Sequence, residues 1–205
     1  MRSSISHQFQ ILAQRIGISV SPHQIEQIGQ FLELLLLWNQ KVNLTGARSI
    51  EDLLNDHLPD SFSMAKIIPS DFNVVDIGSG GGLPGIPFAI LRPESKILLV
   101  EPRAKRTAFL LQACRQLKLS HVTVLRGRLE EIQPQNHVYL SSKATFDPQT
   151  WINLSISLCV ADSRVLAFLG RETNPNELTP TPFQKFHYLT GNNVPRCLAI
   201  FGPSA

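Results

Sequence analysis

The chain has 205 residues, of which 43% are hydrophobic, and a formal net charge of +3. A chain of this size can bury a substantial core, and we expect one main domain with a small accessory segment. The longest apolar run near the start covers only 34–38, far short of the roughly 20 residues that cross a bilayer. The first residues also lack the pattern of a secretory signal. Three scattered cysteines favour free thiols in a reducing cytoplasm over disulfides or zinc. We therefore expect a cytoplasmic protein that uses neither a membrane nor a metal.

The first third of the sequence has helical patterning. We expect helices over 5–20, 22–41 and 49–67. Ser21 followed by Pro22 is typical of a helix start, because serine caps free N–H groups and proline needs no N–H in the first turn. An apolar stripe at three- and four-residue steps follows, formed by Ile25, Ile28, Leu32 and Leu35. Residues 1–68 are expected to form an N-terminal helical extension.

The patterning changes at Phe72. Short runs typical of buried strands cover 72–77, 96–100, 122–125, 137–140 and 164–169, and helical segments cover 84–91, 103–119 and 150–160. This alternation implies βαβ units and a mostly parallel sheet. The segments 183–189 and 197–201 flank a turn at 191–193, which predicts an antiparallel hairpin at the edge of the sheet. Residues 69–205 are therefore expected to form a Rossmann-like α/β domain.

A glycine-rich loop, Asp76–Leu83, follows the first expected strand. In open α/β sheets, ligands bind at the carboxyl ends of strands, and glycines let the backbone approach a ligand closely. Asp76 ends the first strand, where its carboxylate could bind a cationic amino group. Glu101 ends the second strand, where an acid is well placed for ribose hydroxyls. These features predict a nucleoside-containing ligand, although a glycine turn that serves packing alone is the simpler alternative.

The loop departs from the patterns that bind phosphates. A dinucleotide fingerprint needs a third glycine where this chain has Leu83. Pro84 and Pro87 remove N–H donors from the helix start that would meet a pyrophosphate, and no P-loop lysine follows. S-adenosylmethionine (AdoMet) carries no phosphate and tolerates these changes. We therefore expect AdoMet as cofactor, and a nucleotide-linked oxidoreductase is disfavoured.

Positive charge is concentrated between Arg103 and Arg128, a window with seven cations and no Asp or Glu. Such a stretch could contact phosphates, and the alternative is a solvated helix face. The candidate RNA contacts within it are Arg103, Lys105, Arg106 and Arg128.

Three segments resemble one family. They are Trp38-Asn39-x-x-x-Asn43-Leu44-Thr45, the run Asp76–Pro87 with Gly-Leu-Pro-Gly-Ile-Pro after the first glycines, and Lys105-Arg106. Together they closely resemble the RsmG family, also called glucose-inhibited division protein B. The resemblance implies a Rossmann-like methyltransferase that uses AdoMet to methylate guanine N7 in small-subunit (16S) ribosomal RNA, either free or in the assembled small ribosomal subunit. It implies cofactor contacts at Gly78 and Leu83, with Leu129-Glu130 framing the adenine. The full candidate cofactor site is Asp76, Gly78, Gly80, Gly82, Leu83, Glu101, Leu129, Glu130 and Lys143.

The resemblance is weaker where the substrate should lie. The family usually has Ser-Arg-Ala after the fourth strand, and this chain has Lys143 in the middle position. Lysine keeps the charge but loses the planar fork of arginine. The family usually has Lys-Gly after the fifth strand, and this chain has Leu169-Gly170, whereas Arg196 matches a family arginine. Lys143 and Arg196 are candidate positioning residues. These departures leave open a non-catalytic member that still binds AdoMet or RNA.

Methylation at guanine N7 uses an available lone pair, so the resemblance implies no general base and no certain catalytic residue. Other polar and aromatic residues keep two interpretations each. His57 and Asp60 could do acid–base or metal chemistry, but a capping or surface pair is the simpler interpretation. Trp38 could stack on a base, although core packing is more common. Asn39 and Asn43 could bind substrate or fix the helical extension to the domain.

Overall fold

The computed structural model describes residues 2–133, 136–160 and 162–202. Met1 and 203–205, the outer ends of the two expected parts, lie outside the described residues. The helices are α1 (Arg2–Ile16), α2 (Pro22–Val42), α3 (Ile50–Asp56), α4 (Leu58–Ile67), α5 (Gly85–Leu91), α6 (Ala104–Gln116) and α7 (Pro148–Ile156). The strands are β1 (Asn73–Ile77), β2 (Ile97–Val100), β3 (Val122–Leu125), β4 (Val138–Ser142), β5 (Arg164–Leu169), β6 (Gln184–Leu189) and β7 (Pro195–Phe201).

The strands form one seven-stranded sheet in the order β3-β2-β1-β4-β5-β7-β6. The five strands from β3 to β5 are parallel, as the expected βαβ units require. β7 is inserted between β5 and β6 and is antiparallel to both. The expected antiparallel C-terminal hairpin is confirmed, and within it only β7 opposes the direction of the parallel strands. The Rossmann-like fold class is therefore confirmed.

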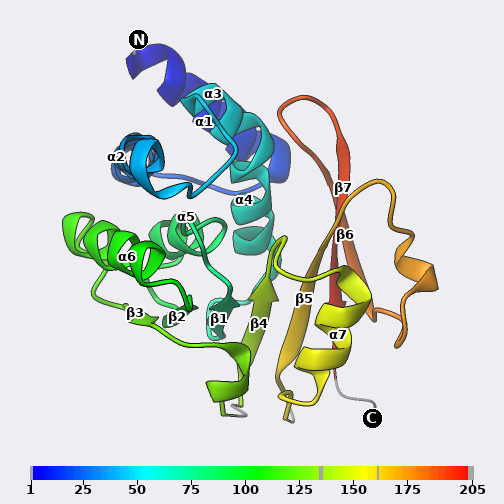
Figure 1. Ribbon diagram of the computed structural model, residues 1–205. Helices are drawn as coiled ribbons and strands as arrows, with labels where there is room; N and C mark the ends of the chain where they lie inside the picture. Colours follow the sequence, from blue (N-terminus) through cyan, green and yellow to red (C-terminus); the bar gives the residue numbers. More distant parts are fainter. Residues whose placement is uncertain (1, 134–135, 161, 203–205) are drawn as a thin grey trace.

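The two faces of the sheet are covered unequally (Figure 1). Along β1, Val74 points into the core shared with α1 to α6, whereas Val75 and Ile77 point into the smaller core under α7. The larger core runs without interruption from Phe9 in α1 to Ile200 in β7. The helices that precede β1 therefore pack on the same face of the sheet as α5 and α6.

The single helix expected over 49–67 is wrong, because the chain breaks at His57 into α3 and α4. Pro59 has no N–H to donate to the carbonyl of Asn55, and proline disfavours helical backbone in the residue before it. The carbonyl of Asn55 accepts instead from the N–H of Gly191 at 2.8 Å. The carbonyl of Asp56 accepts from the Arg196 guanidinium at 2.9 Å. The break thus binds α3 to the β6–β7 hairpin.

Two other expected boundaries shift for local reasons. The helix expected over 150–160 begins earlier, because Asp147 caps its start by accepting from the N–H of Thr150 at 3.0 Å and Pro148 occupies the first turn. The strand expected over 137–140 begins at Val138 and continues to Ser142. That extension places Lys143 directly at the carboxyl end of β4, next to the end of β1.

Candidate active site

The glycine loop crosses the carboxyl ends of β1 and β2 with left-handed backbone at Gly78, Gly80 and Gly82, whose φ angles are +72°, +55° and +74°. The N–H groups of Gly78 and Ser79 both donate to the carbonyl of Val100, which fixes the loop to β2. A side chain at Gly78 would overlap that of Thr145. Glycine is therefore required here both by φ and by space.

Glu101 fastens the loop from the end of β2. Its carboxylate accepts from the N–H of Gly80 at 3.0 Å and from the N–H of Arg103 at 2.9 Å. The side chain is almost fully buried. A carboxylate has about four acceptor positions, so the expected contact with ribose hydroxyls is compatible with these two bonds.

Asp76 lies behind the loop. One carboxylate oxygen accepts from Ser141 Oγ at 3.1 Å, and the other has no hydrogen-bond partner among the described residues. The unpaired oxygen faces Gly85, where a side chain would crowd it. Burial raises the pKa of Asp76 to about 6, against the opposing effect of the Ser141 hydrogen bond. Its side chain faces the α5 layer, so a contact with a cofactor amino group remains a hypothesis.

Two cavities open on either side of the contact between Gly78 and Thr145, and both residues line both cavities. The first lies between the glycine loop and the helical extension, and its walls are about equally polar and apolar: Leu44, Thr45, Gly46, His57, Gly78–Gly81, Leu83, Arg106 and Lys143–Thr145. The second is more apolar and is lined by Ile77, Gly78, Val100, Pro102, Gly127–Glu130, Thr145 and Phe146. The first is called the cleft below, and the second the apolar cavity.

The expected cofactor residues lie partly in the cleft, partly in the apolar cavity and partly outside both. Gly78, Gly80, Leu83 and Lys143 line the cleft, and Leu129 and Glu130 line the apolar cavity. Gly82 lies within the loop, where its added side chain would meet Ile86. Asp76, Gly82 and Glu101 are absent from the described lining of both cavities.

Lys143 belongs to a buried charged cluster that sequence reasoning missed. Its ammonium forms an ion pair with Asp60 and lies 3.2 Å from His57 Nδ1. Arg196 donates to both oxygens of the same carboxylate at 3.0 Å, and Tyr188 donates to one of them at 2.6 Å. The surface interpretation is wrong for Asp60, which is completely buried, whereas His57 is half-buried and lies at the cap position between α3 and α4.

The electrostatics of the cluster follow from this geometry. Burial alone would raise the pKa of Asp60, but Lys143 and Arg196 lower it below its usual value. Burial and the charge of Lys143 lower the pKa of His57 to about 4, so the imidazole is neutral at pH 7. Burial and the Asp60 charge raise the pKa of Tyr188. The cluster therefore holds an ionised Asp60 between two cations, with a neutral histidine beside one of them.

The expected RNA-binding cations lie around the same edge of the sheet. Arg103 and Lys105 are exposed at the start of α6. Arg106 lines the cleft and donates to the carbonyl of Asn43 at 3.2 Å, and Arg128 lines the apolar cavity. The positive window therefore places cations at both openings.

The asparagine and tryptophan that follow the leucine run have structural contacts. Asn39 accepts from the N–H groups of Leu44 and Thr45 at 2.6 and 3.0 Å and donates to the carbonyl of Thr45 at 2.9 Å. It thereby shapes the turn that brings Leu44 and Thr45 to the cleft. The Trp38 ring packs 5.7 Å from that of Phe109, which supports the core interpretation. Leu169 is buried in the core under α7.

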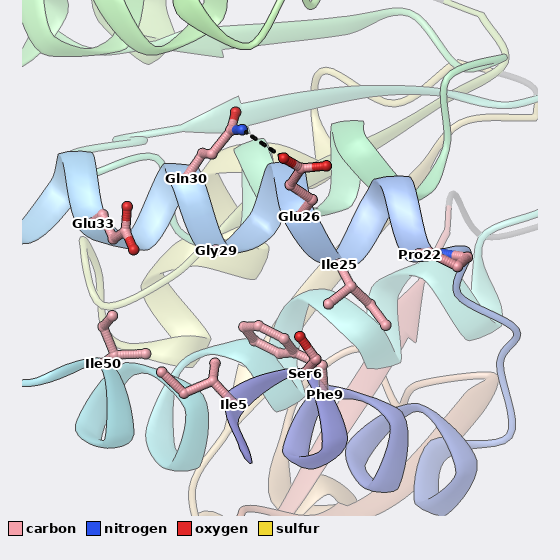
Figure 2. Close-up of a pocket in the computed structure, with 10 residues that line it drawn as sticks. All are labelled: Ile5, Ser6, Phe9, Pro22, Ile25, Glu26, Gly29, Gln30, Glu33 and Ile50. Carbon is pink, nitrogen blue, oxygen red and sulfur yellow. Dashed lines mark hydrogen bonds between the residues drawn. The ribbon is translucent and has the colours of Figure 1, made fainter. Parts of the chain in front are cut away.

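A third cavity lies away from the sheet, between α1 and α2 (Figure 2). Phe9 of α1 and Ile25 of α2 are among its apolar lining residues, and Glu26 and Glu33 add negative charge. Gly29, in the middle of α2, leaves part of this space open. This third cavity is called the helical cavity below.

Within the described ranges, no three acidic, histidine or cysteine side chains are grouped so that they could hold a metal ion. The same ranges contain no helix with the length and apolar character needed to span a membrane.

The fold is similar to those of known proteins. A mutant of MtNAS superposes with a TM-score of 0.57 at 14% identity, covering 89% of this chain and 75% of that chain. TYW2 of M. jannaschii, solved in complex with AdoMet, superposes with a TM-score of 0.53 at 13% identity, covering 71% and 75%. At these identities the similarity concerns the fold alone.

The sequence has closer relatives, all named Ribosomal RNA small subunit methyltransferase G. That of Ectopseudomonas mendocina is 37% identical over 160 residues, 77% of this chain and 75% of the relative. That of Pseudomonas aeruginosa is 34% identical over 166 residues, 80% and 77%. The match to the Pseudomonas entomophila protein is 40% identical but spans only 57% of that protein's length. Residues 24–197 match the family described as rRNA small subunit methyltransferase G, or GidB. The resemblance seen in the sequence is thus confirmed, and the chain belongs to the rRNA small subunit methyltransferase G family.

Proposed function

We propose that this chain transfers the methyl group of AdoMet to N7 of a guanine in small-subunit (16S) ribosomal RNA. The observation that carries the proposal is the pair of cavities at the carboxyl ends of the parallel strands, separated by the glycine loop. The family and the names of the relatives support a methyltransferase that acts on small-subunit rRNA. The choice of guanine N7 rests on the RsmG resemblance and on the chemistry of the cleft.

The residues around the glycine loop fit AdoMet. The apolar cavity, with Leu129 and Phe146 in its wall, suits an adenine ring, which is flat and weakly polar. Glu101 accepts from the loop at Gly80 and keeps acceptor positions that ribose hydroxyls would use. In the cleft, the Arg106 guanidinium provides a positive charge for the methionine carboxylate. Gly78 and Thr145 line both cavities, so a cofactor that occupies both would lie against these two residues.

The chemistry of the cleft suits transfer to a ring nitrogen. AdoMet, when bound, supplies a methyl group on a positively charged sulfur. Guanine N7 carries a free lone pair, so no residue has to remove a proton before the transfer. The contribution of the protein is then alignment and electrostatic positioning. His57, neutral beside Lys143, and the ion-paired Asp60 support positioning over general-base catalysis.

The cations at the two openings suit an RNA substrate. Arg103 and Lys105 are exposed beside the openings, and Arg106 and Arg128 are in their walls. Side chains of this kind neutralise phosphates and position a nucleic acid without reading its sequence. The partner is ribosomal RNA, either free or in the assembled small ribosomal subunit, which places the activity in the cytoplasm.

Mass mapping of 16S rRNA from a strain that lacks the gene tests the proposal. We expect one guanine to lose a methyl group, and the purified chain with AdoMet to restore it. Free 16S rRNA and small subunits from the same strain are the two substrate arms. Calorimetric titration with AdoMet and with NAD(H) is the binding control. AdoMet binding without methyl loss or restoration would support the non-catalytic alternative, and methylation at another base atom would contradict the N7 assignment.

A further inference from the structure

The Lys143 ammonium is held from two directions. An ammonium group has three N–H donors and no acceptor. One donor is used in the ion pair with Asp60, and the distance of 3.2 Å to His57 Nδ1 accounts for a second. Lys143 also lines the cleft. The third donor is therefore the one available to a molecule in the cleft, and its direction is fixed by the other two.

The partner that holds this ammonium is itself immobilised. Asp60 is completely buried. Both of its carboxylate oxygens accept hydrogen bonds from the Arg196 guanidinium, and one of them also accepts from the Tyr188 hydroxyl. Tyr188 and Arg196 meet at Oδ1, and Arg196 shares Oδ2 with Lys143. Since Arg196 and Tyr188 belong to β7 and β6, the β6–β7 hairpin fixes Asp60, and Asp60 in turn fixes Lys143.

His57 acts on the lysine as an acceptor. A neutral imidazole has one donor and one acceptor nitrogen. With Nδ1 accepting from Lys143, the proton is on Nε2, which lies 3.5 Å from Thr45 Oγ1. Burial and the nearby lysine keep the pKa of His57 at about 4, so this neutral form is the one present at pH 7. Asp60 favours the charged histidine and Arg196 opposes it, and their effects are smaller than that of burial.

We propose that His57 and Asp60 are positioning residues that direct the third N–H of Lys143 toward O6 of the target guanine. The inference rests on the proposed function. Guanine presents N7 and O6 as neighbouring acceptors on one edge, whereas adenine presents an amino donor beside N7. A group that only donates hydrogen bonds therefore favours guanine over adenine at the moment when N7 meets the methyl group.

Arg106 is the other cation in the wall of the cleft, and its contacts differ from those of Lys143. Arg106 lies over the glycine loop, near Gly80, and donates to the carbonyl of Asn43. It is therefore the nearer cation to a cofactor that follows the loop. Lys143, which lies beside His57 on the α3–α4 side of the cleft, is left for the substrate.

A pair of His57 variants tests the positioning. His57→Asn keeps an acceptor oxygen near the position of Nδ1, whereas His57→Leu has similar bulk and no acceptor. We expect His57→Leu to slow single-turnover methyl transfer by about tenfold or more, and His57→Asn to stay within about threefold of wild type, since hydrogen bonds to charged groups are the strong ones. His187→Leu, at an exposed position on β6, is the matched control. Equal losses in His57→Asn and His57→Leu would overturn the positioning role.

Lys143→Met tests the contact with O6. We expect AdoMet affinity to change by less than about threefold, while single-turnover transfer falls by about 100-fold, the usual loss for one preorganised donor. A target RNA with 2,6-diaminopurine in place of the guanine keeps N7 and exchanges O6 for an amino group. Wild type should prefer guanine over this base, and Lys143→Met should lose most of the preference. An unchanged preference, or AdoMet affinity that falls in step with the rate, would overturn the contact with O6.

A readout without substrate separates this inference from the proposed function. The ¹⁵N-labelled Lys143 ammonium, held by two acceptors, should give a proton signal in slow exchange with water. We expect the signal in wild type and His57→Asn and its loss in His57→Leu. If wild type methylated no guanine but showed this pattern, the proposed function would fail and the positioning would stand. The same broad signal in all three proteins would overturn the positioning itself.

Discussion

The cleft and the helical cavity have similar volumes, but the glycine in the wall of each has a different role. The cleft has a volume of about 220 Å³ and the helical cavity about 230 Å³, so size does not distinguish them. In the cleft, Gly78 has left-handed backbone, and an added side chain would collide with Thr145. In the helical cavity, Gly29 lies within the regular helix α2, with no atom within 4 Å of the position of an added Cβ.

This difference separates two uses of glycine. At Gly78 the fold needs left-handed backbone and room for the Thr145 side chain, and other residues provide neither. At Gly29 the helix would accept a side chain, and its absence lowers helix stability. The walls differ in the same way: Lys143 in the cleft has specific partners in His57 and Asp60, whereas Glu26 in the helical cavity has only its helical neighbour Gln30 as a hydrogen-bond partner among the described residues.

The largest effect should come from Gly78→Val. A β-branched side chain resists positive φ and would collide with Thr145, which disturbs the wall that the cleft and the apolar cavity share. We expect micromolar-range AdoMet binding in wild type and no detectable binding in the variant by calorimetry. Gly170→Ala, at a site with open space around the added Cβ, is the control. Normal AdoMet binding by Gly78→Val would place the cofactor site elsewhere.

The cations beside the cleft should account for a second, smaller effect. We expect the combined change of Arg103, Lys105 and Arg106 to alanine to weaken RNA binding. Each lost phosphate contact lowers the log–log salt slope by about 0.7–0.9, so, measured without AdoMet, where Arg106 has no cofactor carboxylate to bind, three lost contacts lower it by roughly 2–3. The matched control removes the same charge at Lys66, Lys96 and Lys185, which are exposed elsewhere. Identical slopes for the two triple variants would make the window a solvated surface.

A third prediction concerns stability in acid. The pKa of His57 is about 4 in the folded chain, because of burial and Lys143, against an ordinary value of 6.5. Between these values the unfolded chain binds the extra proton, so His57 costs stability as pH falls from 6.5 to 4. Asp76, with its pKa raised by burial to about 6 from 3.8, acts in the opposite direction between about 6 and 3.8.

Comparing wild type with His57→Asn isolates the histidine, because Asp76 contributes equally to both. Urea unfolding at a series of pH values should show that wild type loses more stability than His57→Asn between pH 6.5 and 4. Parallel curves for the two proteins would mean that His57 keeps its ordinary pKa in the folded chain.

The smallest effect should come from the helical cavity. Gly29→Ala adds a methyl group into open space and restores helix propensity, so we expect a gain of about 0.5–1 kcal/mol in the free energy of unfolding. Urea unfolding at pH 7 measures the gain. Methyl transfer should remain at the wild-type rate, since Gly29 contacts no residue of the cleft. A loss of activity in this variant would give the helical cavity a role that the cleft alone does not explain.

Much of the site could be predicted from local sequence. The glycine loop, Glu101 and the positive window each depend on residues that are close along the chain, and a strand followed by glycines sets the position of the loop by itself. The break at His57 could also be predicted from neighbouring residues, because Pro59 interrupts a helix at this point. The single helix expected over 49–67 is wrong because Pro59 interrupts it.

The cluster around Asp60 could not be predicted in this way. Its partners Tyr188 and Arg196 are 128 and 136 positions away, and nothing in the residues next to Asp60 shows that it is buried. Its neighbours Ser61 and Ser63 are buried as well, although serine is usually exposed. Ser61 and Ser63 alternate with Phe62 and Met64, so neighbouring positions on different faces of α4 are all buried, and only the folded structure shows this.

The α3–α4 break has a consequence for how the protein is made. Asn55, Asp56 and Asp60 accept hydrogen bonds from Gly191, Tyr188 and Arg196, so these bonds form only after β6 and β7 have been translated, whereas Lys143, the other partner of Asp60, is translated earlier. Contacts of such long sequence separation form late in folding. The carboxylate that fixes Lys143 is therefore completed only when the last strands join the sheet. A nascent chain that ends before β6 would display the glycine loop and the positive window while the lysine beside them still had no fixed direction.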